Sequence, residues 1–153
     1  MRLTFICVGR LSKEYQAVWR HYGGLMRPYA DIEVLEVSEA SLSSGEQGAR
    51  EREGAALQSL WRKGAYSIAL DCRGQQYSSE ELSAFLADKK LHGRSHFQLL
   101  LGGAFGLDPV VLSAADHRWS LSRSTFPHQM ARCIVLEQLY RAIRIERGEP
   151  YHH

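Results

Sequence analysis

Short apolar segments alternate with longer amphipathic segments along nearly the whole chain of 153 residues. This alternation of strand and helix signals is typical of an α/β sandwich, three layers thick, with a mainly parallel sheet. We predict strands at 3–8, 32–37, 66–70, 97–101 and 118–121. We predict helices at 13–26, 47–63, 80–91, 109–115 and from about 128 to 147. Because no change of composition marks a boundary, we expect one domain over residues 1–153.

Two of the predicted helices begin with recognisable capping residues. Ser78 precedes Glu81 by three residues, which is the spacing of a capping box. Asp108 precedes Pro109, so an N-cap carboxylate is followed by a residue whose fixed φ suits the first helical turn. These local signals place the starts of two helices.

Composition bounds the class of protein. Hydrophobic residues make up 44% and charged residues 24%, which is ordinary for a soluble globular protein. No apolar run approaches the ~20 residues of a membrane span, and the apolar start is too short for a signal peptide. Cys7, Cys72 and Cys133 lack metal-ligand spacing, so we expect buried thiols, no metal site and a reducing, cytoplasmic location.

The formal net charge is only +2, which argues against nucleic-acid binding through bulk charge. The charge is unevenly distributed, however. From residue 111 onward, four acidic residues face six arginines: Arg118, Arg123, Arg132, Arg141, Arg144 and Arg147. A local basic face suits a polyanionic partner bound at one site, and a solvated helix face is the equally simple alternative.

Two loops in the last third of the chain are candidate ligand-binding segments. Gly102, Gly103 and Gly106 stand between a predicted strand and a predicted helix, where backbone amides can approach a ligand closely. Their spacing matches neither the dinucleotide fingerprint nor a phosphate-binding P-loop, and a tight structural turn is the alternative. A second loop, 121–126, carries three hydroxyl side chains. Because both loops follow predicted strands of a parallel sheet, together they could enclose one small ligand.

The last predicted helix is apolar in nearly every direction between residues 130 and 136. Such a helix must be buried on more than one side, and a chain of this size is most simply completed by a two-fold dimer. Glu137 and Arg141 are spaced for an ion pair on one side of the helix, whereas His128 and Arg132 share another side.

The histidines have several possible roles. His92 and His96 are four residues apart, but the intervening Gly93 argues against a metal site. His128 stands at a helix start, where a neutral ring could bind a substrate edge or cap the helix. Tyr151 could hold the chain end, with His152, against a partner subunit. These patterns predict a ligand-binding α/β dimer and name no reaction.

Beyond these patterns, the chain resembles the ribosomal large-subunit RNA methyltransferase H family, within the SPOUT class, over nearly its whole length. The resemblance begins with the apolar start and the turn at 69–74. Its most specific motifs are Leu-Gly-Gly…Gly-Leu at 101–107, Ser-Leu-Ser…Thr-Phe-Pro-His-Gln at 120–129, Glu-Gln-Leu-Tyr-Arg-Ala at 137–142, and Arg-Gly-Glu-Pro-Tyr-His at 147–152.

This resemblance implies a deep trefoil knot in the C-terminal third and a homodimer that methylates N3 of a pseudouridine. The target would be position 1915, in helix 69 of 23S ribosomal RNA, on assembled ribosomes, with no membrane partner. S-adenosyl-L-methionine would be held by Leu70, Gly102, Gly103, Gly106, Leu121, Ser122, Arg123, Ser124, Thr125 and Phe126. We expect the catalytic residues to be His128, Arg132 and Arg141 of one subunit with Tyr151 and His152 of the other.

Two other functions are weighed against this one. A non-catalytic nucleotide-binding regulator could use the same α/β frame. A nicotinamide-linked oxidoreductase is disfavoured because the chain lacks the dinucleotide fingerprint and the acidic residue that binds the ribose.

Overall fold

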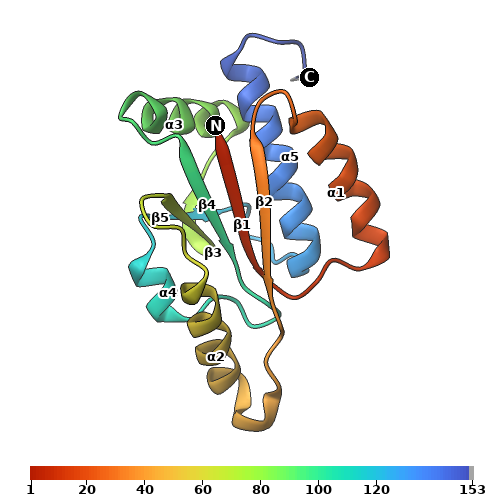
Figure 1. Ribbon diagram of the computed structural model, residues 1–153, viewed down its shortest axis with the longest axis vertical. Coiled ribbons are helices and arrows are strands. Elements are labelled where there is room, and N and C mark those ends of the chain that lie inside the picture. The colour runs from red at the N-terminus through yellow and green to blue at the C-terminus, as the bar shows by residue number, and fades with distance from the viewer. Residues whose placement is uncertain (152–153) are drawn as a thin grey trace.

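The computed structural model describes residues 1–151, which form a five-stranded sheet with helices on both faces (Figure 1). All neighbouring strands are parallel, in the order β2-β1-β4-β3-β5. The predicted α/β sandwich with a parallel sheet is therefore confirmed. The strands are β1 (Arg2–Val8), β2 (Asp31–Val37), β3 (Tyr66–Gln76), β4 (His96–Leu101) and β5 (His117–Ser120).

The helices form two layers. One face of the sheet is covered by α1 (Lys13–Met26), α3 (Ser79–Leu91) and α5 (His128–Glu146). The other face is covered by α2 (Gly45–Ser59) and α4 (Pro109–Ala114), and a short 3-10 turn, η1 (Leu42–Ser44), precedes α2. Over residues 1–151, each helix is too short or too polar to cross a lipid bilayer.

The environment of strand β1 explains the continuous apolar run at the start of the chain. Leu3 and Phe5 point to the layer of α1, α3 and α5, whereas Ile6 and Val8 point to the layer of α2 and α4. Alternate residues of a strand face opposite sides of a sheet, and both sides here are covered. Removing each such side chain from water contributes about 1.5–3 kcal/mol, so this central strand anchors both layers.

Both predicted capping motifs are confirmed. The Glu81 backbone N–H donates to the Ser78 hydroxyl at 3.1 Å, and the Ser78 N–H donates to the Glu81 carboxylate at 2.7 Å. At the start of α4, the Val110 N–H donates to the Asp108 carboxylate at 2.7 Å. Each cap is worth about 1 kcal/mol, and the second holds α4 directly after the glycine loop.

Strand β3 is longer than predicted because it contains a bulge. Both Leu70 and Gln75 pair with Trp119 of β5, so residues 71–74 are displaced from the ladder. The bulge also corrects one prediction. Cys7 and Cys133 are buried as expected, whereas Cys72 lies in the bulge and is exposed.

Candidate functional site

A pocket of about 350 Å³ lies at the carboxyl ends of β3, β4 and β5 and at the start of α5. In open α/β sheets, ligands bind at this edge because loops from neighbouring strands meet there. The volume lies within the range of sites for small ligands. The lining residues from the two candidate loops are Gly102, Gly103, Ala104, Phe105, Gly106, Leu121, Ser122, Ser124, Thr125 and Phe126.

The glycine loop folds tightly on itself. A Cβ on Gly102 would lie 2.5 Å from the carbonyl carbon of Gly106, a separation that backbone atoms cannot tolerate. Gly106 has a φ of +78°, and its N–H donates to the Gly103 carbonyl at 3.1 Å. The loop therefore requires glycine at 102 and 106, and it presents backbone atoms to the pocket.

Helix α2 supports the glycine loop from behind. The Glu53 side chain is 6% exposed, and its Oε1 accepts the Ala40 N–H at 3.0 Å. Its other oxygen is buried without a hydrogen-bond partner among the described residues, 3.3 Å from where a Cβ on Gly103 would lie. The next residue, Gly54, lets the helix approach Asp108, since a Cβ there would be 2.7 Å from the Asp108 Cβ.

The second loop contributes small polar side chains. The Ser120 hydroxyl donates to the Ser122 carbonyl at 3.0 Å, and the Ser124 N–H donates to the Ser122 hydroxyl at 3.0 Å. Leu70 closes the pocket from β3. Nine of the ten residues predicted to hold a cofactor therefore line one pocket, and Arg123 is the one that does not.

Asp71 is a pocket residue that the sequence analysis missed. Its side chain is 11% exposed, and its Oδ2 is buried without a hydrogen bond, 3.7 Å from the Arg73 guanidinium nitrogen Nε. A carboxylate placed directly after a predicted buried strand was the signal that could have identified it. The remaining lining residues gave no such signal: Cys72, Leu101, Leu107, Trp119 and Ala131.

His128 lies at the start of α5 and also lines the pocket. Its Nε2 is 3.4 Å from the Oε1 atom of Glu39, in the loop after β2, and it makes no hydrogen bond. The Glu39 side chain packs against the turn after β1. A Cβ on Gly9 in that turn would lie 2.7 Å from the Oε1 atom of Glu39. A carboxylate from the loop after β2 thus faces the imidazole, and no pattern in the sequence had indicated this arrangement.

Arg132, one turn after His128, is directed away from the pocket. Its guanidinium donates to Glu36 at 2.7 Å and stacks on the Trp19 ring, 4.9 Å from the centroid. The side chain is 6% exposed, and its Nε lacks a hydrogen-bond partner within residues 1–151. Arg132 therefore joins α5 to α1 and β2 in this subunit.

Arg141 and Tyr151 form a separate cluster at the other end of α5. Arg141 donates to Glu137 at 2.6 Å, which confirms the predicted ion pair, and its guanidinium lies 4.8 Å from the centre of the Tyr151 ring. Burial, followed by a hydrogen bond with Tyr22, raises the pKa of Tyr151 to about 12. His152, the other predicted tail residue, lies outside the described residues.

His128 and Tyr151 are far apart within one chain, and Arg141, which was predicted to lie with His128, lies beside Tyr151 of the same chain instead. His128 begins α5, whereas Tyr151 lies beyond its end, and a helix of 19 residues is about 28 Å long. Figure 1 shows the C-terminal end of α5 on the side where the strands begin, whereas the residues that line the pocket lie where strands end. A single subunit therefore does not bring these side chains together.

The fold and the pocket define a parallel α/β protein with a ligand-sized pocket made by two loops from the last third of the chain. A family described as "Predicted SPOUT methyltransferase" matches residues 1–152, which places the chain among the SPOUT methyltransferases. A protein of Symbiobacterium thermophilum is 42% identical over 99% of both chains. A protein of Pelotomaculum thermopropionicum is 44% identical over 99% of this chain and 98% of its own.

Both relatives are named "Ribosomal RNA large subunit methyltransferase H", as is a 40% identical protein of Bifidobacterium adolescentis that is matched over 99% of each chain. The chain belongs to this family of SPOUT methyltransferases. Membership implies that the C-terminal third, which carries both pocket loops, forms the family's trefoil knot.

Proposed function

We propose that this protein transfers the methyl group of S-adenosyl-L-methionine to N3 of a pseudouridine in helix 69 of 23S ribosomal RNA. The family and the names of the relatives support a large-subunit ribosomal RNA substrate. The observation that carries the proposal is the convergence of nine residues, expected from the resemblance to hold the methyl donor, on one pocket.

The residues of the pocket fit this cofactor. S-adenosyl-L-methionine supplies an activated methyl group on a sulfonium cation. The glycine loop offers backbone groups at close range, and the hydroxyls of Ser124 and Thr125 suit adenosine. Asp71 has a buried oxygen without a hydrogen bond, and a cation would satisfy it. Transfer then depends mainly on holding donor and acceptor in line.

The acceptor nitrogen carries a proton at neutral pH. If its pKa lies about two units above the working pH, removing that proton costs roughly 2.7 kcal/mol. A nearby cation or an aligned base supplies energy of that size. His128 lines the pocket and is placed to contact the acceptor base, while Arg141, Tyr151 and His152 would have to come from a second subunit.

Tyr151 is suited to hold the acceptor base rather than to deprotonate it. With its pKa raised to about 12, the phenol is protonated at neutral pH and donates a hydrogen bond. Its present acceptor is Glu137, at 3.4 Å. Arg141, stacked on the ring, adds the positive charge that favours an anionic base. Arg132 holds the start of α5 against β2 through Glu36, so its role in the proposed reaction would be to position the helix that carries His128.

A homodimer resolves the separation between His128 and Tyr151. Two-fold packing of antiparallel α5 helices places the end of one beside the start of the other. The outer side of α5 offers half-exposed apolar side chains for this contact, and Met130 is 39% exposed. We accordingly propose a site that combines the pocket of one subunit with the tail of its partner, acting on ribosomes in the cytoplasm.

The test uses ribosomes from cells that lack this protein. Incubation with the purified protein and S-adenosyl-L-methionine should add one methyl group to a single pseudouridine, located by mass spectrometry of the RNA. Calorimetry should show binding of S-adenosyl-L-methionine and S-adenosylhomocysteine and none of nicotinamide dinucleotide. Donor binding without methylation of any ribosomal preparation would favour the regulator instead.

A further inference from the structure

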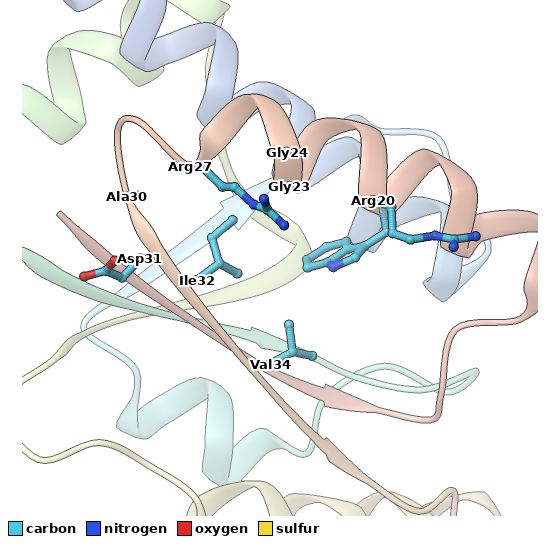
Figure 2. A pocket seen from close by; sticks show the side chains of 9 residues that line it. Arg20, Gly23, Gly24, Arg27, Ala30, Asp31, Ile32 and Val34 are labelled. Carbon is cyan, nitrogen blue, oxygen red and sulfur yellow. The ribbon is translucent and has the colours of Figure 1, made fainter.

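A groove runs between α1 and the edge strand β2, outside the pocket described above. It consists of two hollows, of about 350 Å³ and 400 Å³, that share Trp19 and Val34 in their lining. Figure 2 shows the first hollow, with α1 on one side and residues Asp31, Ile32 and Val34 of β2 on the other. No part of residues 1–151 covers it.

The groove carries arginines that lack acidic partners. Arg20, in α1, and Arg27, the residue that caps the end of α1, are about two helical turns or 10 Å apart along the axis, and both line the first hollow. Arg20 donates only to the Gln16 carbonyl, at 3.2 Å, and Arg10 lines the second hollow. In the described chain none of the three has an ion pair. Asp31 is the acidic residue of the first hollow, so the balance is positive.

Two glycines keep the first hollow open. Gly23 and Gly24 lie within α1, where glycine is a poor helix former. A Cβ on either residue would meet nothing within 4 Å, so packing inside the subunit does not require glycine there. Their effect is to leave the helix backbone accessible to a molecule that approaches from outside.

The groove leads to the mouth of the cofactor pocket. Arg132 lines the second hollow, and His128, one helical turn earlier on α5, lines the pocket. The Ser12 N–H donates to the Gln129 side chain at 2.7 Å, which joins the start of α1 to the start of α5. The pocket and the second hollow therefore both lie at the start of α5, one helical turn apart.

We propose that this groove binds the sugar–phosphate backbone of the RNA strand next to the target nucleotide, with Arg20 and Arg27 contacting phosphates. The proposal rests on the proposed function, which supplies the RNA. Charge complementarity favours this occupant, because unpaired guanidinium groups beside an open hollow are suited to phosphate oxygens. The Trp19 ring adds an aromatic edge to the same lining, as in surfaces that bind single strands.

The first experiment removes the two charges. The double variant Arg20→Gln/Arg27→Gln is compared with Arg52→Gln, an exposed arginine of α2 on the opposite face of the sheet. Each lost phosphate contact to a single strand should reduce affinity about fivefold at 0.1 M salt, so the double variant should lose about 25-fold in kcat/KM, mainly through KM. The dependence of log kcat/KM on log salt should become shallower by about 1.4. Arg52→Gln should change neither quantity.

The second experiment separates charge from size. Gly24→Glu and Gly24→Gln place side chains of equal length in the same open space. A phosphate in the groove predicts that Gly24→Glu binds unmethylated 70S ribosomes at least fivefold more weakly than Gly24→Gln. Calorimetry with S-adenosyl-L-methionine should give the same affinity for both variants, which shows that both are folded.

Ribosome binding and methyl transfer are measured separately, so the two proposals can fail separately. If the wild-type protein binds ribosomes but transfers no methyl group, the proposed function is refuted. The proposed groove is then still tested by comparing the ribosome affinities of the variants. Unchanged binding and an unchanged salt slope in the double arginine variant refute the groove. An equal loss of ribosome binding in Arg52→Gln also refutes the groove. Conversion of the double variant to a monomer refutes it as well, because the groove would then be an interface between copies.

Discussion

At the residue scale, the pocket combines one carboxylate with hydroxyls and backbone groups. Asp71 is the pocket residue with a buried oxygen that makes no hydrogen bond, whereas the serine loop satisfies part of its own polar capacity. An unsatisfied buried oxygen is costly in the absence of a ligand. We therefore expect Asp71, whose ion pair with the exposed Arg73 spans 3.7 Å, to interact with a cation that enters the pocket.

We expect Asp71→Asn to weaken S-adenosyl-L-methionine binding by about 10- to 150-fold, because a charge-assisted contact of about 1.5–3 kcal/mol is lost. S-adenosylhomocysteine lacks the sulfonium charge, so its affinity should fall less. Calorimetric titration of both ligands measures the ratio. Equal losses for the two would place the carboxylate away from the sulfonium.

His117 gives the protein a predicted dependence of stability on pH. Burial, with a contribution from Lys89, lowers the pKa of this imidazole below its ordinary value, and its Nε2 lies 2.9 Å from the Tyr77 hydroxyl oxygen. The unfolded chain therefore binds the proton more readily than the folded chain. The contribution of neutral His117 to the free energy of unfolding is fully present above about pH 6.5, and it is lost as the pH falls through the pKa that His117 has in the folded protein.

Urea unfolding at pH 8 and pH 5 tests this sign. The free energy of unfolding should be lower at pH 5, and His117→Gln should reduce the difference between the two pH values. His96, whose pKa is also lowered by burial and by Arg2, remains in that variant and keeps part of the effect. A difference that is unchanged in His117→Gln would contradict the prediction.

At the element scale, the glycine loop is the part of the pocket with the least freedom. Its shape depends on contacts between residues of the loop itself and on Glu53 behind it. A strand end, a turn and the cap of α4 follow one another within a few residues. A local change should therefore affect the cofactor directly.

Gly102→Ala should reduce donor affinity by about 5- to 150-fold, because overpacking against the Gly106 backbone costs about 1–3 kcal/mol in the loop shape that binds the donor. Gly23→Ala is the matched control, since its added carbon meets open space. That control should keep donor affinity and stabilise α1 by about 1 kcal/mol. Calorimetry and urea unfolding of both variants check the contrast.

At the scale of the whole molecule, the position of the tail argues for a shared site. The Tyr151 cluster and the His128 pocket lie at opposite ends of α5, so in the proposed homodimer each subunit would contribute one half-site at each end of this helix.

Coexpression of His128→Ala and Tyr151→Ala chains tests the shared site. Each homodimer should be inactive. In a heterodimer, one site receives both substitutions and the other receives neither, so a random mixture should retain about one quarter of wild-type activity. The measurement is methyl transfer to ribosomes by the mixed preparation. Activity no greater than that of the separate variants would assign both residues to sites within one chain.

Local patterns made much of the fold predictable. The five strands and five helices were placed from apolar periodicity, and the caps at Ser78 and Asp108 were found because capping involves neighbouring residues. The bulge in β3 was not foreseen, since it depends on pairing with β5, far along the chain. For the same reason, the sequence did not identify Asp71 or Glu39 as neighbours of the pocket and His128.

Local sequence was enough to place the order of elements and the two loops of the pocket, because period, capping and glycine content act over a few residues. The pairing of Glu36 with Arg132 and the distance of a helix length between Tyr151 and His128 became visible only in the folded chain. These relations join residues distant in the chain, and their separation in space is set by how the helices pack on the sheet.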